Sequence, residues 1–444
     1  MKYRFSFDSH KILISGATLF LTCANFANAA TPIDFQRALE LGIANSRQAS
    51  MAKSDVEAEQ EREKQVLAGF GPRANVSFSE NRFDKAVSTK FGPSVLVLRP
   101  DEITAGSFSI EQPLVGLYTN FKRYELQQSQ SQLTTLNKEI SEVQSKFLAA
   151  SAYLAAQQAR EFVKIAQASL NATENQVHDA QSMVHSGRLL KVGFLKIDLA
   201  RLDAKALLAK AEAAREKASA NLAHVLGTTP SEELILDELP SIESAEKMSE
   251  PYLIQNDKNS ASARLEIKQS EIEMERAQRS KNLVATKFLP SANLFAKWDH
   301  DFGEPPFGYP KDSRTLGLTF NWEIWDNGSR FFALSEQSAL ISKSRTAHLE
   351  KTERYQLEIN ALVSDLKAAR EALIVTHAGL AQAEEAYRLE KARFASGLST
   401  ATDLVLSETA QTKVRGNAVV AIAEVQRLMF EIQRSSGQSS PSQK

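Results

Sequence analysis

The sequence predicts a mainly α-helical protein that also contains four β-strands, arranged as two copies of one structural unit. Three observations carry this prediction: a motif that occurs twice, four short segments in which apolar and polar residues alternate, and two long segments with an apolar residue at every third or fourth position. Alternation at period two is typical of strands, whereas spacings of three and four are typical of helices. Each half is therefore predicted to run helix, strand, loop, strand, long helix, tight turn and helix.

The first 29 residues have the pattern of a secretory signal peptide. A basic start is followed by an apolar run over residues 12–26 and by a small-x-small cleavage site at residues 27–29. The chain's one cysteine, Cys23, lies in this segment. Lipid attachment at Cys23 is the alternative interpretation, but Thr22 stands where a lipoprotein signal has a smaller residue. Cleavage after residue 29 leaves an exported chain with neither a disulfide nor a cysteine metal site.

Composition narrows the classes of protein that fit. The chain has 444 residues, of which 43% are apolar, and a formal net charge of -1. A nucleic-acid-binding surface needs clustered basic residues that acidic neighbours do not neutralise, so this balance argues against nucleic acid as a partner. Beyond the signal, no apolar run reaches the ~18 residues that a membrane helix needs. Any part that spans a membrane is therefore predicted to be a closed β-barrel.

A short motif occurs twice and marks an internal duplication. Phe-x-Pro-x-Ala-Asn begins at Phe70 and again at Phe288, each time between a charged helical stretch and an alternating one. Proline disfavours helix at the residue before it. Pro72 and Pro290 are therefore predicted to mark the points where a helix stops and a strand begins.

Four segments alternate between apolar and polar residues, as half-buried strands do. They are residues 74–79, 107–111, 292–299 and 315–322. Each strand has room for roughly nine to eleven residues, the length that crosses a bilayer when the strand is tilted. The alternative is an amphipathic sheet on a soluble core.

The stretches that join the strands of each pair are predicted to be exposed loops. About residues 84–103 and 300–313 are rich in Gly, Pro and charge, which is typical of loops. Asp299-His300-Asp301 resembles a metal cluster only in composition, because three adjacent residues at a strand end do not converge on one point. No metal site is therefore predicted.

Two long segments carry apolar residues at alternating spacings of three and four, the signature of helices that pack side by side. In the first half this seam runs from Leu133 to Leu154 and, after a phase shift, from Val163 to Val184. The second half has its counterpart around Leu373. A helix over residues 121–184 would be on the order of 100 Å long. Since no globular core of this size is so long, the helices are expected to be rods that pack laterally.

A tight turn is predicted at the tip of each of the two hairpins. Gly187 and Gly397 follow the helical patterns, and glycine just past a helix is the usual left-handed stop. Thr400-x-x-Asp403 is a capping pattern for the helix that returns from the second turn.

The junctions between strands and rods are also marked in the sequence. Pro113 is expected at a strand end because proline cannot donate to a ladder. Asp326 and Gly328 lie in an Asp-Asn-Gly-Ser turn that is expected to be a hinge and helix start.

A signal peptide, two strand pairs, two long helical hairpins and an internal duplication together resemble the TolC family of outer-membrane efflux channels, over essentially the whole mature chain. The motifs that carry the resemblance are IDFQRAL at residues 33–39, FLPSANL at residues 288–294, WEIWDNGSR at residues 322–330 and GLSTATDLV at residues 397–405. Their order and spacing make the match specific.

The resemblance implies a homotrimer in the outer membrane with a helical tube that projects into the periplasm. Each protomer would give four strands to a twelve-stranded β-barrel and its hairpins to a trimeric α-barrel. The number of strands in one chain agrees with a trimer. Four strands cannot close a barrel around a passage, and open strand edges are not tolerated in lipid. The implied activity is passive conduction, in multidrug efflux or type I secretion, without catalysis or a cofactor. The implied partners are a periplasmic adaptor (membrane fusion protein) and an inner-membrane pump or ABC exporter.

The resemblance also assigns roles to individual residues. It places adaptor contacts at the two tips, whose residues are Ser186, Gly187, Arg188, Ser396, Gly397 and Leu398. It places Asp403 at the periplasmic aperture, where three copies would form a ring that attracts cations. The chain departs from the family one turn further, where a second acid is expected and Leu406 stands. The alternative for Asp403 is that it is only a helix cap.

The predicted organisation has five parts. They are a signal peptide over residues 1–29, a first repeat over 30–227, an equatorial linker over 228–260, a second repeat over 261–437 and a disordered tail over 438–444. The main alternative is a periplasmic coiled-coil adaptor or scaffold, which would carry hairpins at only one place in the chain. An enzyme is not expected, because the seven histidines are scattered and no serine-nucleophile, zinc-helix or phosphate-loop motif is present.

Overall fold

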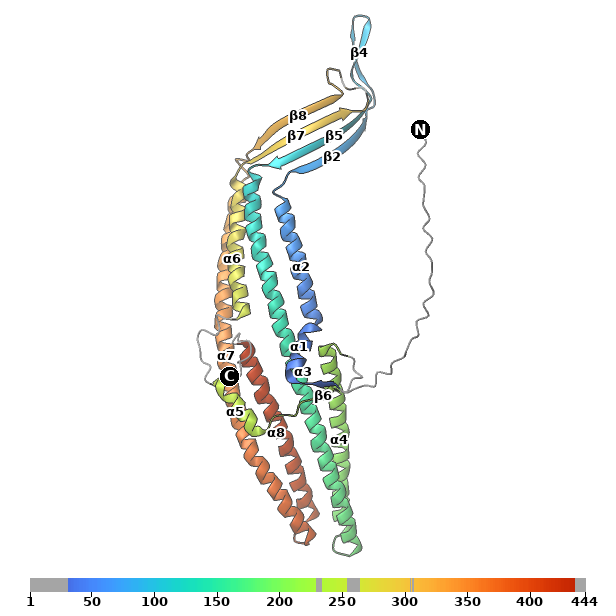
Figure 1. Cartoon of the computed structure of the whole chain (residues 1–444), viewed down its shortest axis with the longest axis vertical. Helices are drawn as coiled ribbons and strands as arrows, with labels where there is room; N and C mark the ends of the chain where they lie inside the picture. The colour runs from blue at the N-terminus through green and yellow to red at the C-terminus, as the bar shows by residue number, and fades with distance from the viewer. Residues whose placement is uncertain (1–30, 229–233, 254–263, 304, 306, 436–444) are drawn as a thin grey trace, which may run out of the picture.

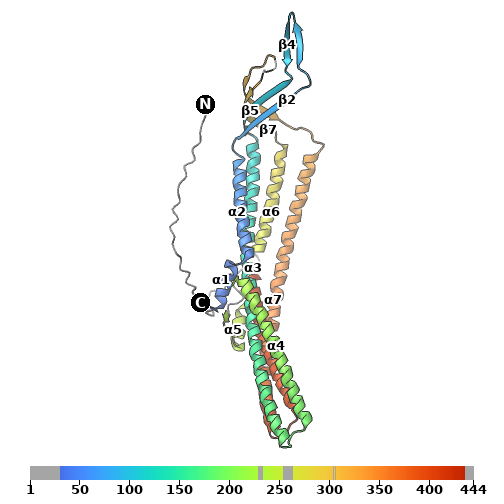
Figure 2. The ribbon, with the colours of Figure 1, turned by 90° about the vertical axis from the view of Figure 1, so that its right-hand side faces the viewer.

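The computed structural model is an elongated molecule with a β-sheet at one end and the tips of two helical hairpins at the other (Figure 1). It describes residues 31–228, 234–253, 264–303, 305 and 307–435. A view from the side shows that the helices run along the long axis of the molecule (Figure 2). The predicted signal peptide, with Cys23, and the predicted tail over residues 438–444 lie outside the described residues.

Four antiparallel strands form the sheet, in the order β2-β5-β7-β8. They are β2 (Arg73–Arg82), β5 (Glu102–Pro113), β7 (Ser291–Asp301) and β8 (Asp312–Asn321). The two predicted strand pairs are therefore confirmed. They join into one sheet because β5 of the first repeat pairs with β7 of the second.

The segment between the first two strands is not the loop that its composition indicated. Val87–Phe91 (β3) and Ser94–Arg99 (β4) pair as a separate β-hairpin that rises beyond the sheet (Figure 1). Gly92, with a φ of 63°, lies in the turn between them. The expectation of a loop was wrong because Gly, Pro and charge mark the base and turn of this segment. Most residues in between are β-branched, aliphatic or aromatic, and such residues favour strands.

The sheet has one apolar and one polar face, as the alternation predicted. One cross-strand row contains Val76, Phe108 and Trp298, and the next row, on the opposite face, contains Ser77, Ser107 and Asp299. The described chain leaves the apolar face uncovered, and its exposed large side chains are Val76, Phe78, Phe108, Ile110, Leu294, Trp298, Leu316, Leu318 and Phe320. The residues on this face need another environment, which the described part of a single copy does not supply.

Long helices form two antiparallel hairpins below the sheet. The first hairpin consists of α3 (Gly116–His185) and α4 (Lys191–Leu226), and the second of α7 (Ser329–Ala395) and α8 (Ala401–Ser435). α3 has 70 residues and α7 has 67. Each is therefore roughly 100 Å long at 1.5 Å per residue. The predicted rods are confirmed, and none of the described helices is both long and apolar enough to cross a membrane.

Two further helices complete the layer directly beneath the sheet. α2 (Arg47–Ala68) lies against α3, and α6 (Leu265–Ala285) lies against both α3 and α7. A single turn of 3-10 helix, Thr286–Phe288, leads from α6 to the proline before β7. Each of these helices carries the chain from mid-height up to a strand, so each repeat approaches the sheet on a short helix and leaves it on a long one.

Burial is spread along the rods in separate clusters. The predicted seam contributes Leu373 to one cluster and Ala180 and Phe394 to another, and Leu170 of the seam is also buried. The cluster at mid-height is built from α3 residues outside the seam, such as Ala149 and Tyr153. One cluster surrounds Tyr153 at mid-height, a second surrounds Leu373, and a third joins the two hairpins near their tips. The rods are thus held laterally at several levels, as the three-four spacing predicted.

A small folded region at mid-height ties the start of the described chain and the linker to the rods. β1 (Thr31–Ile33) pairs in parallel with β6 (Leu234–Leu236). α1 (Phe35–Ala44) contacts α3 and α4, while α5 (Ile242–Leu253) contacts α7 and α8. In its described part, the segment predicted as an equatorial linker is therefore built from regular elements that touch both hairpins.

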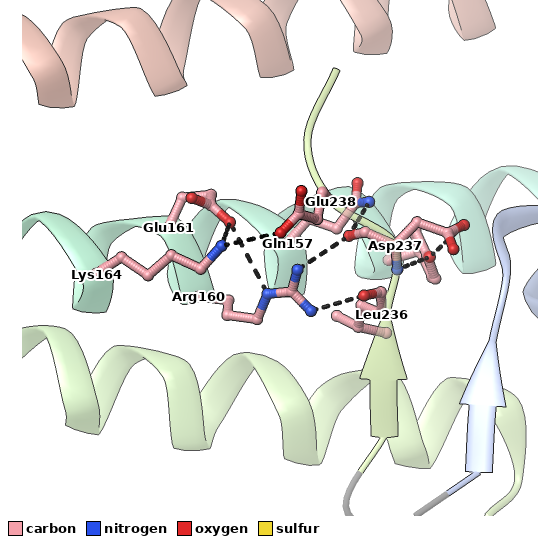
Figure 3. A network of polar contacts seen from close by, with 8 residues as sticks. Gln157, Arg160, Glu161, Lys164, Leu236, Asp237 and Glu238 are labelled. Atoms are coloured by element: carbon pink, nitrogen blue, oxygen red, sulfur yellow. Dashed lines mark hydrogen bonds and ion pairs between the residues drawn. The ribbon is translucent and has the colours of Figure 1, made fainter. Parts of the chain in front are cut away.

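Polar side chains of α3 bind the last residue of β6 and the residue after it (Figure 3). Arg160 donates to the Leu236 carbonyl at 2.6 Å, and Gln157 donates to the Asp237 carbonyl at 2.9 Å. The buried Tyr153 hydroxyl accepts from the Asp237 N–H at 3.0 Å and lies 3.1 Å from the Asp237 carboxylate. Burial raises the pKa of Tyr153 to about 12, so this hydroxyl is neutral at physiological pH.

Candidate functional site at the hairpin tips

The two hairpin tips have the same backbone turn, as the duplication predicted. Each long helix is followed by a serine and then by a glycine in the left-handed conformation, with a φ of 69° at Gly187 and 73° at Gly397. The next N–H returns to the carbonyl five positions earlier, at 2.8 Å from Arg188 and 2.9 Å from Leu398. This is the Schellman turn, in which glycine avoids the strain that a side chain would bring.

All six predicted tip residues lie exposed at the end of the molecule farthest from the sheet (Figure 1). They are Ser186, Gly187, Arg188, Ser396, Gly397 and Leu398. The two tips differ in chemistry, because Arg188 in the first occupies the position that Leu398 occupies in the second. A partner that meets both tips therefore meets one cationic and one apolar side chain.

Asp403 is exposed and forms a reciprocal cap with Thr400 at the start of α8. Its carboxylate accepts from the Thr400 hydroxyl at 2.7 Å and from the Thr400 N–H at 3.3 Å, while the Asp403 N–H donates to the Thr400 hydroxyl at 3.2 Å. These hydrogen bonds, with a smaller contribution from the charge of Arg393, lower the pKa of Asp403 below its ordinary value. The predicted cap is present, and the carboxylate is charged at neutral pH.

Leu406 lies one helical turn from Asp403 on the same exposed face of α8. The side chain of Leu406 is 62% exposed, whereas Leu404 and Glu408 face the other way and are buried. The exposed stripe at the start of α8 therefore combines one carboxylate with one apolar side chain. This is the position at which the family pattern would place a second acid.

The two hairpins are tied to each other just above their tips. An apolar cluster joins them, and its buried members are Ala180, Met183, Ile197, Phe394, Ala401 and Leu404. Lys196 of α4 donates to the Thr402 hydroxyl at 2.9 Å, and the Ser169 hydroxyl of α3 donates to the buried Glu408 carboxylate at 2.6 Å. Sequence reasoning missed these bridges, because the spacing of residues within one helix carries no information on which distant helix they face.

The prolines singled out from the sequence lie where strands begin or end. Pro72 directly precedes β2, Pro290 directly precedes β7, and Pro113 is the last residue of β5. Gln112, next to Pro113, donates to the Phe70 carbonyl at 3.0 Å and so joins the two ends of the first strand pair. These are structural roles, and they confirm the predicted boundaries.

The turn from β8 into α7 is fixed by an ion pair that the sequence did not reveal. Gly328, with a φ of 82°, precedes the helix, and Asp326 accepts from the backbone N–H and the Nε of Arg330 at 3.0 and 2.9 Å. Burial opposes ionisation of Asp326, but these hydrogen bonds and the charge of Arg330 outweigh it and lower the pKa of Asp326. Arg330 is itself buried, and the predicted turn leads directly into the predicted helix start.

The described residues contain no group of three His, Cys, Asp or Glu side chains placed to hold a metal ion. In the Asp299-His300-Asp301 run, the His300 ring faces the Asp312 carboxylate on the neighbouring strand at 2.9 Å. At the tips, the surface available to a partner consists of exposed charged and apolar side chains, such as Arg188 and Leu398.

Comparison with known proteins relates this architecture to outer-membrane channels. Residues 258–438 match the family model described as Outer membrane efflux protein. A search of curated proteins by sequence finds no match. Among solved structures, similar chains include CusC, whose reported structures concern transmembrane channel formation, the outer membrane protein VceC of Vibrio cholerae and the MtrE outer membrane channel of Neisseria gonorrhoeae in its open state.

These structural matches span nearly the whole molecule at low sequence identity. CusC is 13% identical with a TM-score of 0.78, over 91% of this chain and 92% of that chain. VceC is 16% identical with a TM-score of 0.73, over 91% and 96%. MtrE is 15% identical with a TM-score of 0.70, over 91% and 88%. The fold is therefore shared throughout, and residues 258–438 carry the sequence pattern of the family described as Outer membrane efflux protein.

Proposed function

We propose that the protein is a homotrimeric outer-membrane channel that passively conducts substrates received from a periplasmic adaptor and an inner-membrane pump. The observation that carries the proposal is the sheet. It has an uncovered apolar face, a polar face and two free edges, and it stands on two helical rods. An apolar face suits lipid, and a polar face suits an aqueous passage.

The free edges of the sheet support assembly from several copies. Within the described chain, β2 and β8 each pair on one side only. Unpaired strand edges are not tolerated in lipid. Because β8 runs antiparallel to β7, and β2 antiparallel to β5, β8 of one copy can pair antiparallel with β2 of the next. Three copies joined in this way would close a barrel of twelve strands.

An exposed apolar seam on α4 supports the same assembly in the tube. Val192, Leu195, Leu199 and Leu202 recur at spacings of three and four, and all are exposed in the single chain. This spacing fits a helix that packs against another along its length. In the proposed trimer a helix of the neighbouring copy covers the seam, so that six hairpins close the tube.

The tips supply the proposed aperture and the adaptor contacts. Three copies of Asp403 would form a ring of negative charge that attracts cations, with a ring of Leu406 one turn further along. Arg188 and Leu398 would meet the adaptor, whether the assembly serves tripartite efflux or type I secretion. Duplicated hairpins favour this role over the alternative of a periplasmic adaptor, which would carry hairpins at one place only.

Recording conductance tests the proposed function. Protein purified from outer membranes and added to planar lipid bilayers should give discrete, cation-selective steps, because the narrowest part of the passage carries Asp403. A matched sample with Leu199→Glu should give fewer steps, since the charge disrupts the α4 seam. Assembled wild-type protein that inserts into the bilayer but never conducts would contradict the proposal.

A further inference from the structure

The two free edges of the sheet, β2 and β8, carry the same order of side chains on the apolar face (Figure 1). From the end next to the rods outward, each edge strand places three apolar side chains on this face and then two charged ones. On β2 they are Ala74, Val76, Phe78, Glu80 and Arg82, and on β8 they are Phe320, Leu318, Leu316, Arg314 and Asp312. Both edges therefore end in a pair of charges at the outer rim of the sheet.

The charges at the two outer rims are complementary. Counted outward, β2 has an acid followed by a base, whereas β8 has a base followed by an acid. Each strand has ten residues. If the two strands pair antiparallel over their full length, Glu80 lies opposite Arg314, and Arg82 lies opposite Asp312. Directly opposite side chains have Cβ atoms about 4.5–5.5 Å apart, which allows ion pairs. The three apolar positions of each strand then face apolar positions as well.

The neighbouring registers match less well. A shift by one residue sets the apolar side chains of one strand on the polar face of the other. A shift by two residues puts Asp312 opposite Glu80 in one direction and Arg314 opposite Arg82 in the other. Like charges directly opposite each other destabilise a strand pair. Among these registers, full overlap is the one that combines matched faces with opposite charges.

The four charged side chains are accessible in the single chain. The side chains of Glu80, Arg82 and Asp312 are 46%, 72% and 60% exposed. The Arg82 guanidinium lies 3.0 Å from the carboxylate of Glu80 on its own strand and 3.8 Å from that of Glu102 on β5. Within the described part of the chain, the exposed Arg314 has no hydrogen bond or ion pair. Arg314 is thus a cation without a carboxylate partner, at a free edge and on the apolar face.

We propose that the charged outer ends of β2 and β8 form ion pairs between neighbouring copies and set the register in which these copies join. The pairs are Glu80 with Arg314 and Arg82 with Asp312. The inference rests on the proposed trimer, in which β8 of one copy pairs with β2 of the next. Each junction then has two acids and two bases at the outer rim and no net charge from them. A slip by two residues brings like charges together, so the three junctions close in one register.

Engineered cysteines test the register. Because Cys23, the chain's one cysteine, lies in the predicted signal peptide, the mature chain has no competing thiol. Two strands separate β2 from β8 within one chain, so a disulfide between them must join two copies. Oxidised trimers of Val76→Cys with Leu318→Cys, which are opposite in the proposed register, should give covalent dimers and trimers on denaturing gels. In the matched pair Phe78→Cys with Leu318→Cys, links should form at least several-fold more slowly, because diagonal neighbours are roughly 7 Å apart.

Charge reversal with rescue tests the ion pairs. Arg314→Glu puts a second carboxylate opposite Glu80, so the fraction of protein that sediments as trimer should fall several-fold at low salt. Adding Glu80→Arg to the same chain restores opposite charges at every junction and should recover most of the loss. Lys90→Glu, a charge reversal at an exposed position of β3 and away from both edges, is the matched control and should leave the trimer fraction unchanged. A double variant as poor in trimer as Arg314→Glu alone would show that these two charges do not meet.

Sedimentation of the unaltered protein in the same detergent separates failure of the register from failure of the trimer. Trimers that link no faster through Val76→Cys than through Phe78→Cys would overturn the proposed register and leave the proposed channel standing. Trimers that Arg314→Glu does not weaken would overturn the ion pairs in the same way. Absence of trimers in the unaltered protein would overturn the proposed function and the register with it.

Discussion

At the scale of single residues, one carboxylate near the tips has an observed role as a helix cap and a proposed role at the aperture. Asp403 caps α8 through Thr400 and is exposed on the face that the proposed aperture would use. The cap was predictable, because Thr-x-x-Asp is a local pattern with a local consequence. The ion pair of Asp326 with Arg330 and the bridge from Ser169 to Glu408 were not, because each depends on how distant elements or a buried turn come together.

Two variants separate the roles of Asp403. Asp403→Asn keeps a side chain that can accept from Thr400 but removes the charge, so block of the channel by multivalent cations should weaken. Thr400→Ala keeps the charge but removes the capping hydroxyl, which should lower the stability of the protein by ~1 kcal/mol with block retained. Single-channel recording and thermal unfolding measure the two effects. Unchanged block in Asp403→Asn would reduce Asp403 to a helix cap.

Tyr153 gives the equatorial anchor a dependence on pH. Its pKa is raised from 10.0 to about 12, so its contribution to stability is fully present below pH 10 and is lost as the pH rises through about 12. Tyr153→Phe removes the acceptor of the Asp237 N–H, which should cost about 0.5–1.5 kcal/mol.

Thermal unfolding followed between pH 8 and pH 12 measures this dependence. Tyr153→Phe should be less stable at pH 8 and should change less with pH than the unaltered protein. Tyr118→Phe is the matched control, because Tyr118 is exposed. If Tyr153→Phe lost stability with pH as steeply as the unaltered protein, another group would have to be the source of the dependence.

At the scale of elements, strands and rods were predictable because their periods are written in short stretches of sequence. Pro72 and Pro290 mark strand starts through a steric rule that acts on the neighbouring residue. The β-hairpin formed by β3 and β4 was not predicted, because its strands are short and its base and turn resemble a loop. How α2, α6 and the mid-height elements dock on the rods was not predicted either, because apolar spacing shows that a face is buried but not against which partner.

A pair of glycines tests the account of the tips. Gly397 has a φ of 73° with open space around it, so Gly397→Ala should lower stability by about 1 kcal/mol through backbone strain alone. Gly379 lies inside α7, where the nearest neighbour of an added Cβ would be Val414 Cγ1 at 4.0 Å. Gly379→Ala should therefore stabilise the helix by roughly 0.5–1 kcal/mol. Chemical denaturation measures both, and the opposite order of stability would contradict the left-handed turn.

At the scale of the whole molecule, the described residues of a single chain leave two apolar surfaces exposed. The apolar face of the sheet is uncovered, and the seam of α4 is exposed along several turns. The sequence predicted amphipathic strands and rods, but it did not show which faces one chain covers by itself. The structure distinguishes these faces on α4. Its buried residues, such as Ile197 and Ala204, lie on one side of the helix, and the exposed seam lies on another.

Charge on the α4 seam should prevent assembly. Leu199→Glu places a carboxylate where the proposed trimer buries an apolar side chain, so the fraction of trimer in detergent should fall sharply. Lys205→Glu, at an exposed position about 100° around the same helix from the seam, is the matched control and should leave the trimer intact. Chromatography with light scattering gives both masses. Full assembly of Leu199→Glu would show that this seam is not an interface.

The most direct test of the central claim is the mass of the detergent-solubilised mature protein by analytical ultracentrifugation. Three chains per particle, with the detergent contribution subtracted and a mainly helical circular dichroism spectrum, are the expected result. A water-soluble monomer that is extracted without detergent would contradict the account.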